Sequence, residues 1–129
     1  METEFVPYEQ ALALKELGFD ELCVKEFHKC ILLTNSCGEE ATNSELIHLY
    51  GKEGTVIAAP LWQQAFKWFW NTQGLYVEFF VDDDQTFGFL ISRFVEEGRM
   101  DYPSKRGYSN PEIAEFNCLK ALIEIVKSI

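Results

Sequence analysis

Cysteine and histidine side chains gather early in the chain, where they could bind a metal ion. Cys23, His28, Cys30 and Cys37 lie in one stretch, and His48 follows it. Zinc prefers thiolate and imidazole ligands, but structural zinc sites pair ligands two to four residues apart, and no Cys-x-x-Cys occurs here. The spacing favours reduced, partly buried thiols, with a metal site as the weaker alternative. We therefore expect no cofactor.

A run of three carboxylates, Asp82–Asp84, has the oxygen atoms that a hard divalent cation requires. A calcium-binding loop also needs glycine at its sixth position and glutamate at its twelfth. Counted from the first aspartate, these positions hold Phe87 and Arg93. We therefore interpret the run as the solvated turn of a hairpin.

Sequence motifs for catalysis are missing from the chain. Gly51-Lys52 lacks the leading glycine and the following serine or threonine of a phosphate loop, and no Gly-x-Ser-x-Gly occurs. The sequence therefore predicts no catalytic residue and favours a protein without enzymatic activity. A small enzyme whose catalytic groups come from scattered positions is kept as an alternative, because spatial clusters need not leave a linear motif.

One stretch between residues 93 and 108 is locally basic and carries tyrosines that could help to grip a phosphate or an acidic peptide. Its members are Arg93, Arg99, Tyr102, Lys105, Arg106 and Tyr108. Three carboxylates, Glu96, Glu97 and Asp101, interrupt it, so a solvated loop is the favoured interpretation.

The segment with the strongest pattern is a predicted helix over residues 60–73. A step of 100° per residue places a narrow polar stripe on an otherwise apolar surface. Trp68 and Trp70 fall on the two borders of this stripe, and tryptophan is the side chain most enriched at contact hot spots. The candidate partner contacts are Lys67, Trp68, Trp70 and Asn71, with a purely internal role for the tryptophans as the alternative.

The remaining elements follow from apolar periodicity and from glycine and proline positions. Helices are predicted over residues 7–17 and from Pro111 onward, the latter with an inner stripe formed by Ala114, Cys118, Ala121, Leu122 and Ile125. Strands are predicted within residues 22–33 and 45–50, and loops over 34–44, 51–54 and 95–108. A hairpin is predicted from residues 75–82 and 86–94, with Leu75, Val77, Phe79 and Val81 on its buried face.

These elements predict an α+β fold, in which an antiparallel sheet that includes the hairpin of the C-terminal half packs against about three helices. A length of 129 residues is near the usual size of one domain, so we expect residues 1–129 to form a single domain. Apolar residues make up 47% of the chain and aromatic residues 15%, which excludes a disordered protein.

The formal net charge of -10 repels phosphate groups and therefore disfavours direct binding to nucleic acids or to anionic membranes. No secretory leader and no apolar run of about 18 residues occurs in the sequence. Together with the sparse cysteines, this predicts a cytoplasmic protein.

Short segments of the chain are similar in sequence to other proteins. They are VPYEQAL (residues 6–12), LGFDE (17–21), APLWQQAFKWF (59–69) and EFNCLKALI (115–123). On these segments the chain resembles a family of small phage-associated and bacterial proteins with no assigned function. Residues 34–55 depart from that pattern. The resemblance implies a mobile-element context and no catalytic residue, cofactor or partner.

The preferred function is a non-enzymatic accessory protein that binds another protein or self-associates through the aromatic helix or the second face of the hairpin. A second hypothesis is DNA mimicry, in which carboxylates imitate phosphate spacing and occupy a nucleic-acid-binding protein. The excess of acidic groups in the first half of the chain, eleven against four basic groups in residues 1–60, permits that hypothesis.

Overall fold

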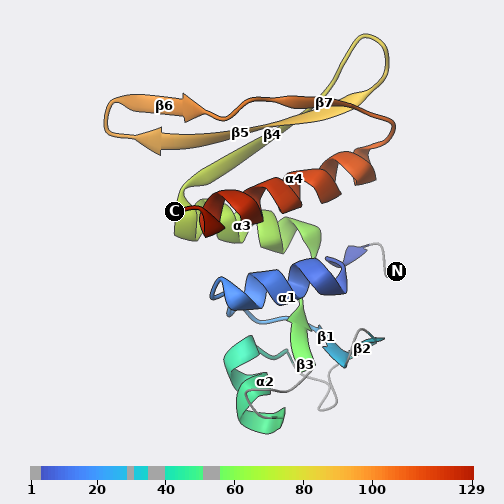
Figure 1. Ribbon diagram of the computed structural model, residues 1–129. Helices are drawn as coiled ribbons and strands as arrows, with labels where there is room; N and C mark the ends of the chain where they lie inside the picture. Colours follow the sequence, from blue (N-terminus) through green and yellow to red (C-terminus); the bar gives the residue numbers. More distant parts are fainter. Residues whose placement is uncertain (1–3, 29–30, 35–39, 51–55) are drawn as a thin grey trace. The chain divides into compact units, whose positions relative to one another are not determined.

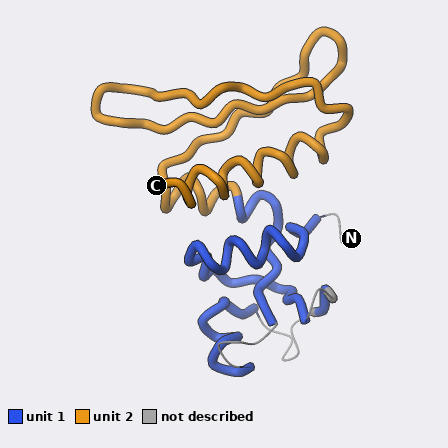
Figure 2. The backbone as a smooth tube through the Cα atoms, in the orientation of Figure 1, with its two compact units in different colours: residues 1–65 blue, residues 66–129 orange. Residues whose placement is uncertain are grey.

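The computed structural model describes residues 4–28, 31–34, 40–50 and 56–129 (Figure 1). These residues form four helices and two antiparallel sheets, one of three strands and one of four. The predicted α+β class is therefore confirmed. The chain divides into two compact units, residues 1–65 and 66–129, which Figure 2 colours separately. The single domain stays a prediction, and each unit is described by itself.

The first unit is a small sheet between two helices. It contains α1 (Tyr8–Glu16), β1 (Lys25–His28), β2 (Ile31–Thr34), α2 (Asn43–Tyr50) and β3 (Val56–Ala59), and the strand order is β2-β1-β3. Tyr8 of α1 packs edge to face on Phe27, with ring centroids 5.5 Å apart. The next residue along β1, His28, packs on Tyr50 of α2 at 5.4 Å. Successive side chains of a strand point to opposite faces, so α1 and α2 cover different faces of the sheet.

The predicted helix over residues 7–17 is confirmed as α1. Pro7 precedes this helix, and Gly18, which follows it, adopts a left-handed conformation at φ 100°. The single strand predicted within residues 22–33 is wrong in detail, because the segment contains two strands, β1 and β2, that pair with each other. Residues 35–39 of the loop predicted over 34–44, and the turn predicted at 51–54, lie outside the described residues. At the ends of the predicted loop, Thr34 belongs to β2 and Asn43 and Ser44 belong to α2.

The strand predicted over residues 45–50 is wrong, because the structure places helix α2 there. Thr42 and Glu45 form a capping box at its start. The Glu45 carboxylate accepts a hydrogen bond from the Thr42 amide at 3.0 Å, and the Thr42 hydroxyl accepts one from the Glu45 amide at 3.2 Å. The sequence Thr-x-x-Glu is a signal of a helix start, and it outweighs the short apolar alternation that suggested a strand.

Asn43 ties α2 to the rest of the first unit. Its side-chain amide donates to the Phe19 carbonyl at 2.9 Å, and its side-chain oxygen accepts from the Ala58 amide at 2.8 Å. Asn43 is only 3% exposed. Buried backbone groups are normally hydrogen-bonded, and this side chain bonds one carbonyl and one amide where water does not reach.

The second unit is a four-stranded sheet with a long helix against it. It contains most of α3 (Trp62–Gln73), followed by β4 (Leu75–Val81), β5 (Phe87–Val95), β6 (Gly98–Asp101), β7 (Lys105–Tyr108) and α4 (Pro111–Lys127). The strand order is β4-β5-β6, and β7 also pairs with β5. The predicted helix over residues 60–73 and the predicted hairpin are confirmed. The loop predicted over 95–108 is wrong, because β6 and β7 lie in it.

The sequence pattern did not predict strands β6 and β7, because almost none of their side chains is buried. All four residues of β6 are exposed, as are three of the four in β7. A strand held by backbone hydrogen bonds to β5 needs no apolar alternation, and alternation is the signal that sequence patterns detect. Gly98, at φ 130°, makes the turn from β5 into β6, a conformation that glycine adopts without strain.

Helix α4 packs on β5 and β7. Its N-cap is Asn110, whose side chain accepts a hydrogen bond from the Ile113 amide at 2.8 Å, as the cap and proline at the helix start predict. Its buried residues are Ala114, Cys118, Leu119, Leu122 and Ile123. The buried stripe is therefore rotated about the helix axis relative to the predicted one. The prediction included Ala121 and Ile125, whereas the structure buries Leu119 and Ile123 instead.

The outer half of the hairpin is less buried than its alternation predicts. Leu75 is fully buried, whereas Phe79 is 45% and Val81 is 61% exposed. On the other face, Phe80 lies opposite Gly88 in the register of β4 and β5. A Cβ atom added to Gly88 would lie 2.6 Å from the Phe80 ring and 2.5 Å from the Lys105 carbonyl oxygen, so the close approach of ring and backbone requires glycine.

We predict that Asn43→Ala lowers the free energy of unfolding by about 3 kcal/mol. The substitution removes the hydrogen bonds of Asn43 to a buried carbonyl and to a buried amide, and loss of a partner by a buried polar group costs about 1–3 kcal/mol. Chemical denaturation of the purified variant measures the loss. The control is Asn110→Ala, which removes an exposed helix cap worth about 1 kcal/mol. A loss for Asn43→Ala no larger than that of the control would contradict the prediction.

Candidate functional site

Three aromatic side chains of the second unit meet at its surface. Trp70 of α3 packs edge to face on Tyr76 of β4 and on Phe94 of β5, with ring centroids 5.8 Å and 5.9 Å apart. The exposed fractions are 46% for Trp70, 44% for Tyr76 and 54% for Phe94. We call these three residues the aromatic cluster. Their mutual contacts hold each ring in place while about half of its surface faces solvent.

The local chain path explains why the cluster forms. Gly74 ends α3 at φ 66°, a left-handed conformation that reverses the chain within one residue. β4 therefore starts directly after the helix and carries Tyr76 back beside Trp70. Tyr76 lies opposite Ser92 of β5, so Phe94, two residues further along β5, is its diagonal neighbour on the same face of the sheet.

A groove of about 230 Å³ lies beside the cluster. Its lining residues are Phe66, Lys67, Trp70, Leu75, Tyr76, Val77 and Phe79. The groove therefore joins one tryptophan, one tyrosine and one lysine in a mainly apolar depression of the surface. This combination can hold an apolar side chain of a partner and place a carboxylate or carbonyl group near the lysine.

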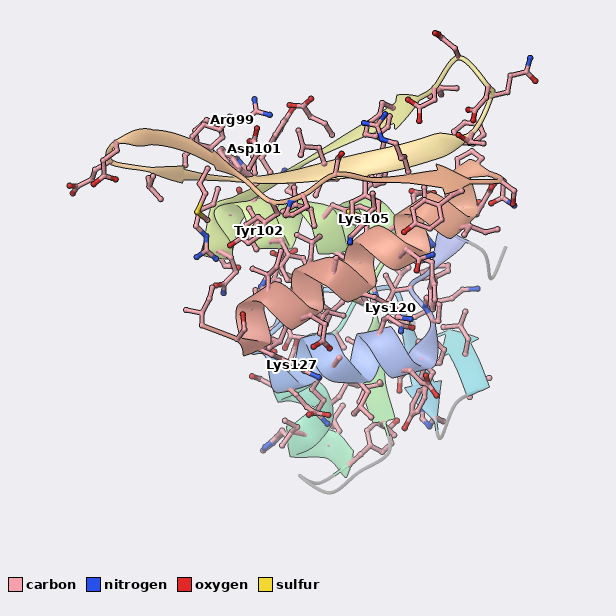
Figure 3. The ribbon with its side chains drawn as sticks, turned by 45° about the horizontal axis from the view of Figure 1, so that its top comes forward. Arg99, Asp101, Tyr102, Lys105, Lys120 and Lys127 are labelled. Atoms are coloured by element: carbon pink, nitrogen blue, oxygen red, sulfur yellow. The ribbon has the colours of Figure 1, made fainter. Side chains whose placement is uncertain are left out.

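Charged side chains flank the aromatic cluster on the same face of the sheet. The Arg99 Nε donates to Asp101 Oδ1 at 2.6 Å, and its Nη2 lies 3.3 Å from Glu78 Oε1. The buried Ser92 hydroxyl also donates to Asp101, at 2.7 Å. The hydrogen bond from Arg99, and next that from Ser92, hold the pKa of Asp101 below its ordinary value of 3.8. Figure 3 shows Arg99 and Asp101 on the sheet and Lys120 and Lys127 on α4.

The structure separates the four predicted contact residues. Lys67 and Trp70 line the same groove, and Asn71 is exposed but does not line it. Trp68 is only 5% exposed, which favours the internal role that the sequence left as the alternative for this residue. Positions two residues apart on a helix differ by about 200°, and one border of the polar stripe is therefore buried while the other is exposed. Sequence patterns missed Tyr76 and Phe94, because their contact with Trp70 depends on the chain reversal at Gly74.

A buried carboxylate and a histidine form a second cluster, in the first unit. Glu26 is 1% exposed, and its Oε2 lies 2.6 Å from His28 Nε2. A nucleophilic triad would also need a serine or cysteine at the imidazole. Among the described residues, no hydroxyl or thiol is hydrogen-bonded to His28, so the pair carries no catalytic assignment.

The predicted thiols are buried where the structure describes them. Cys23 and Cys118 are both buried. Burial, and next the charge of Glu21, raises the pKa of Cys23 to about 12, and burial also raises the pKa of Cys118. Cys30 and Cys37 lie outside the described residues. No group of three or more His, Cys, Asp or Glu residues in the described part of the chain could hold a metal ion.

Two arginines of the basic stretch pair with carboxylates of the same unit. Arg99 pairs with Asp101 and Glu78, as described above. Arg106 lies 3.2 Å from Asp82 Oδ1, and its guanidinium stacks over the Phe80 ring at 4.9 Å. These contacts occupy Arg99 and Arg106 on the polar face of the sheet and do not form a phosphate site, whereas the buried Arg93 Nε has no hydrogen-bond partner within the described part of the chain.

Comparison of the chain with protein-family models, with curated proteins and with solved structures finds no significant match. The resemblance to small phage-associated proteins therefore stays a prediction. Across residues 4–28, 31–34, 40–50 and 56–129, no helix combines the length and the hydropathy that spanning a bilayer requires.

We predict that Arg99→Gln raises the pKa of Asp101 toward 3.8, because the hydrogen bond from Arg99 is the main cause of its lowered value. Because the pKa of Asp101 is lower in the folded protein than its ordinary value of 3.8, the hydrogen bonds to its carboxylate stabilise the fold above pH 3.8. This stabilisation is lost as the pH falls through the pKa of the folded protein. Carboxyl ¹³C NMR titration measures the shift. Arg106→Gln removes the same charge without touching Asp101, so an equal shift in that variant would contradict the assignment.

We predict that iodoacetamide at pH 8 leaves Cys23 and Cys118 unmodified in the folded protein and alkylates both in guanidinium chloride. The thiolate is the reactive species, and burial suppresses both its formation and its access to the reagent. Peptide mass mapping resolves each cysteine separately. Native alkylation of either residue at the rate of the unfolded chain would refute its burial.

Proposed function

We propose that this protein is a non-enzymatic accessory protein that binds another protein, or a second copy of itself, through the aromatic cluster and the adjoining groove. One observation supports the proposal above all others: three contacting aromatic rings, each about half exposed, are bordered on the same face by the Glu78–Arg99–Asp101 ion cluster. An apolar centre with a polar rim is the anatomy of a contact hot spot.

The geometry favours binding over a merely structural role for these rings. Tryptophan and tyrosine present large apolar areas with few rotatable bonds, so they lose little entropy when a partner covers them. The cluster is also held by edge-to-face contacts before a partner arrives. A prearranged surface loses less free energy on binding than a mobile one.

The proposal is tested first by self-association. Sedimentation equilibrium of the wild-type protein up to about 500 μM gives its dissociation constant if it forms an oligomer. We expect Trp70→Ala to weaken that association about thirtyfold or more, since a hot-spot tryptophan contributes at least about 2 kcal/mol. Leu49→Ala is the matched control, because Leu49 of α2 is 64% exposed and lies outside the cluster. Circular dichroism verifies that both variants are folded.

If the wild-type protein is monomeric, the same three proteins serve as baits for quantitative affinity capture. A partner is accepted only when the wild-type and Leu49→Ala baits retain it, the Trp70→Ala bait loses it, and the purified pair reproduces this difference. A monomer with no such partner would overturn the proposal, and so would an association that Trp70→Ala, Tyr76→Ala and Phe94→Ala all leave unchanged.

A further inference from the structure

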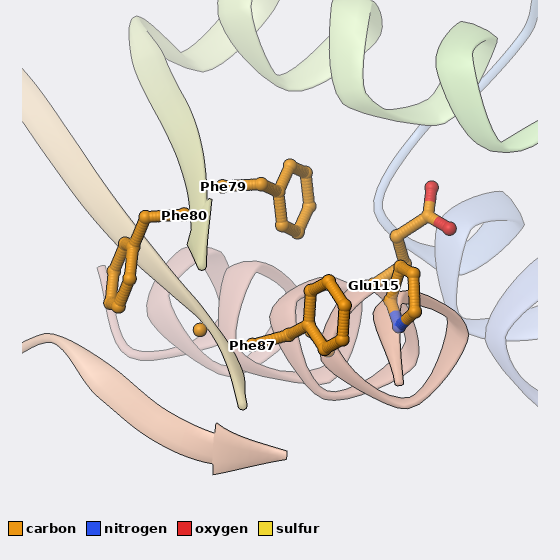
Figure 4. Close-up of a pocket in the computed structure, with 7 residues that line it drawn as sticks. Phe79, Phe80, Phe87 and Glu115 are labelled. Atoms are coloured by element: carbon orange, nitrogen blue, oxygen red, sulfur yellow. The ribbon is translucent and has the colours of Figure 1, made fainter. Parts of the chain in front are cut away.

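A separate pocket of about 290 Å³ opens between the hairpin and the start of α4 in the second unit. Its walls are Phe79, Phe80 and Phe87 of the hairpin, Gly88, and three residues of α4 that include Glu115. Figure 4 shows Glu115 on the same side as the Phe79 and Phe87 rings, while the Phe80 ring lies on the other side of β4. The volume is at the lower end of small-molecule sites, about 300–1,000 Å³, so only a compact group fits.

Glu115 is the one ionisable side chain that lines this pocket. It makes no hydrogen bond or ion pair with any other described residue. The charge that acts on it is that of Glu112, one helical turn earlier. Burial, and next the charge of Glu112, raises the pKa of Glu115. A carboxylate at the edge of phenylalanine rings is thus only partly solvated and has no cation of its own.

We infer that the pocket binds a compact organic cation, an alkylammonium group whose charge meets the Glu115 carboxylate and whose carbon atoms lie on the Phe79 and Phe87 rings. Aromatic faces attract cations and also accept methyl and methylene groups. Phe80 of the same hairpin already carries one cation, the Arg106 guanidinium at 4.9 Å from its centroid. The net charge of -10 further favours a positively charged ligand.

Other ligand classes fit this pocket less well. An anion would meet Glu115 and Glu112 at the same helix start and would be repelled. A neutral apolar molecule would remove water from Glu115 without providing a charge in return. The ammonium group alone satisfies both the rings and the carboxylate.

The pocket shares Phe79 with the groove beside the aromatic cluster, but none of the three residues of the cluster lines the pocket. Phe79 and Tyr76 lie three residues apart on β4, an odd spacing that places them on opposite faces of the sheet. Loss of one function therefore need not affect the other. Trp70→Ala serves here as a variant that keeps the pocket intact.

The test uses choline and its neutral isostere 3,3-dimethylbutan-1-ol, which differ in one quaternary atom and its charge. Titration of the full-length protein followed by ¹H,¹³C NMR of the phenylalanine rings gives the dissociation constant of each. We expect choline to bind at least about tenfold more tightly than the alcohol. Glu115→Gln should weaken choline about tenfold, whereas Glu124→Gln, which removes the same charge from an exposed position of α4, should change the constant less than twofold.

Two further arms identify the source of the cation. Binding of Nα-acetyl-lysine amide as tight as that of choline indicates the lysine side chain of a protein partner, and tighter binding of choline indicates a free ammonium compound. Equal binding of choline and the alcohol would overturn the inference. So would the absence of choline binding, or unchanged binding in Glu115→Gln, a variant that removes a partly buried, unpaired charge and should fold at least as well as the wild type.

Discussion

The antiparallel register of β4 against β5 is the constraint on which the second unit depends. It sets Tyr76 opposite Ser92 and Phe79 opposite Phe89, and because strand side chains alternate, it sorts the hairpin's aromatic rings onto two faces. One face carries Tyr76 and Phe94, and the other carries the rings that meet α4. A slip of one residue would exchange the two faces and destroy the aromatic cluster and the pocket together.

Much of this fold could be predicted from the sequence where burial and periodicity coincide. The aromatic helix and the β4–β5 hairpin have long apolar patterns that end at Gly74 and at the aspartate turn, so their type and position were confirmed. Helix α2 was missed because its start depends on two polar residues, Thr42 and Glu45, and not on an apolar pattern. Strands β6 and β7 were missed because almost all of their residues are exposed, and the backbone pairing and polar contacts that hold them produce no apolar alternation in the sequence.

The candidate site likewise contains one residue that a local pattern predicts and two that depend on contacts between elements. Trp70 was predicted from its place on the border of a polar stripe, which is a local property of one helix. Tyr76 and Phe94 join it only after the chain reverses at Gly74 and β5 pairs with β4, and no pattern within one element reports such a contact. Likewise, Glu115 is one carboxylate among 21 acidic residues, and only its position beside the phenylalanine rings distinguishes it.

The close approach of Phe80 to Gly88 has a consequence for the evolution of this hairpin. Any side chain at position 88 would collide with the ring and with the Lys105 carbonyl oxygen, whereas a smaller residue at position 80 would relieve only the first collision. Position 88 should therefore be held as glycine more strictly than position 80 is held as an aromatic residue. Divergent descendants of this chain would lose the ring before they lose the glycine.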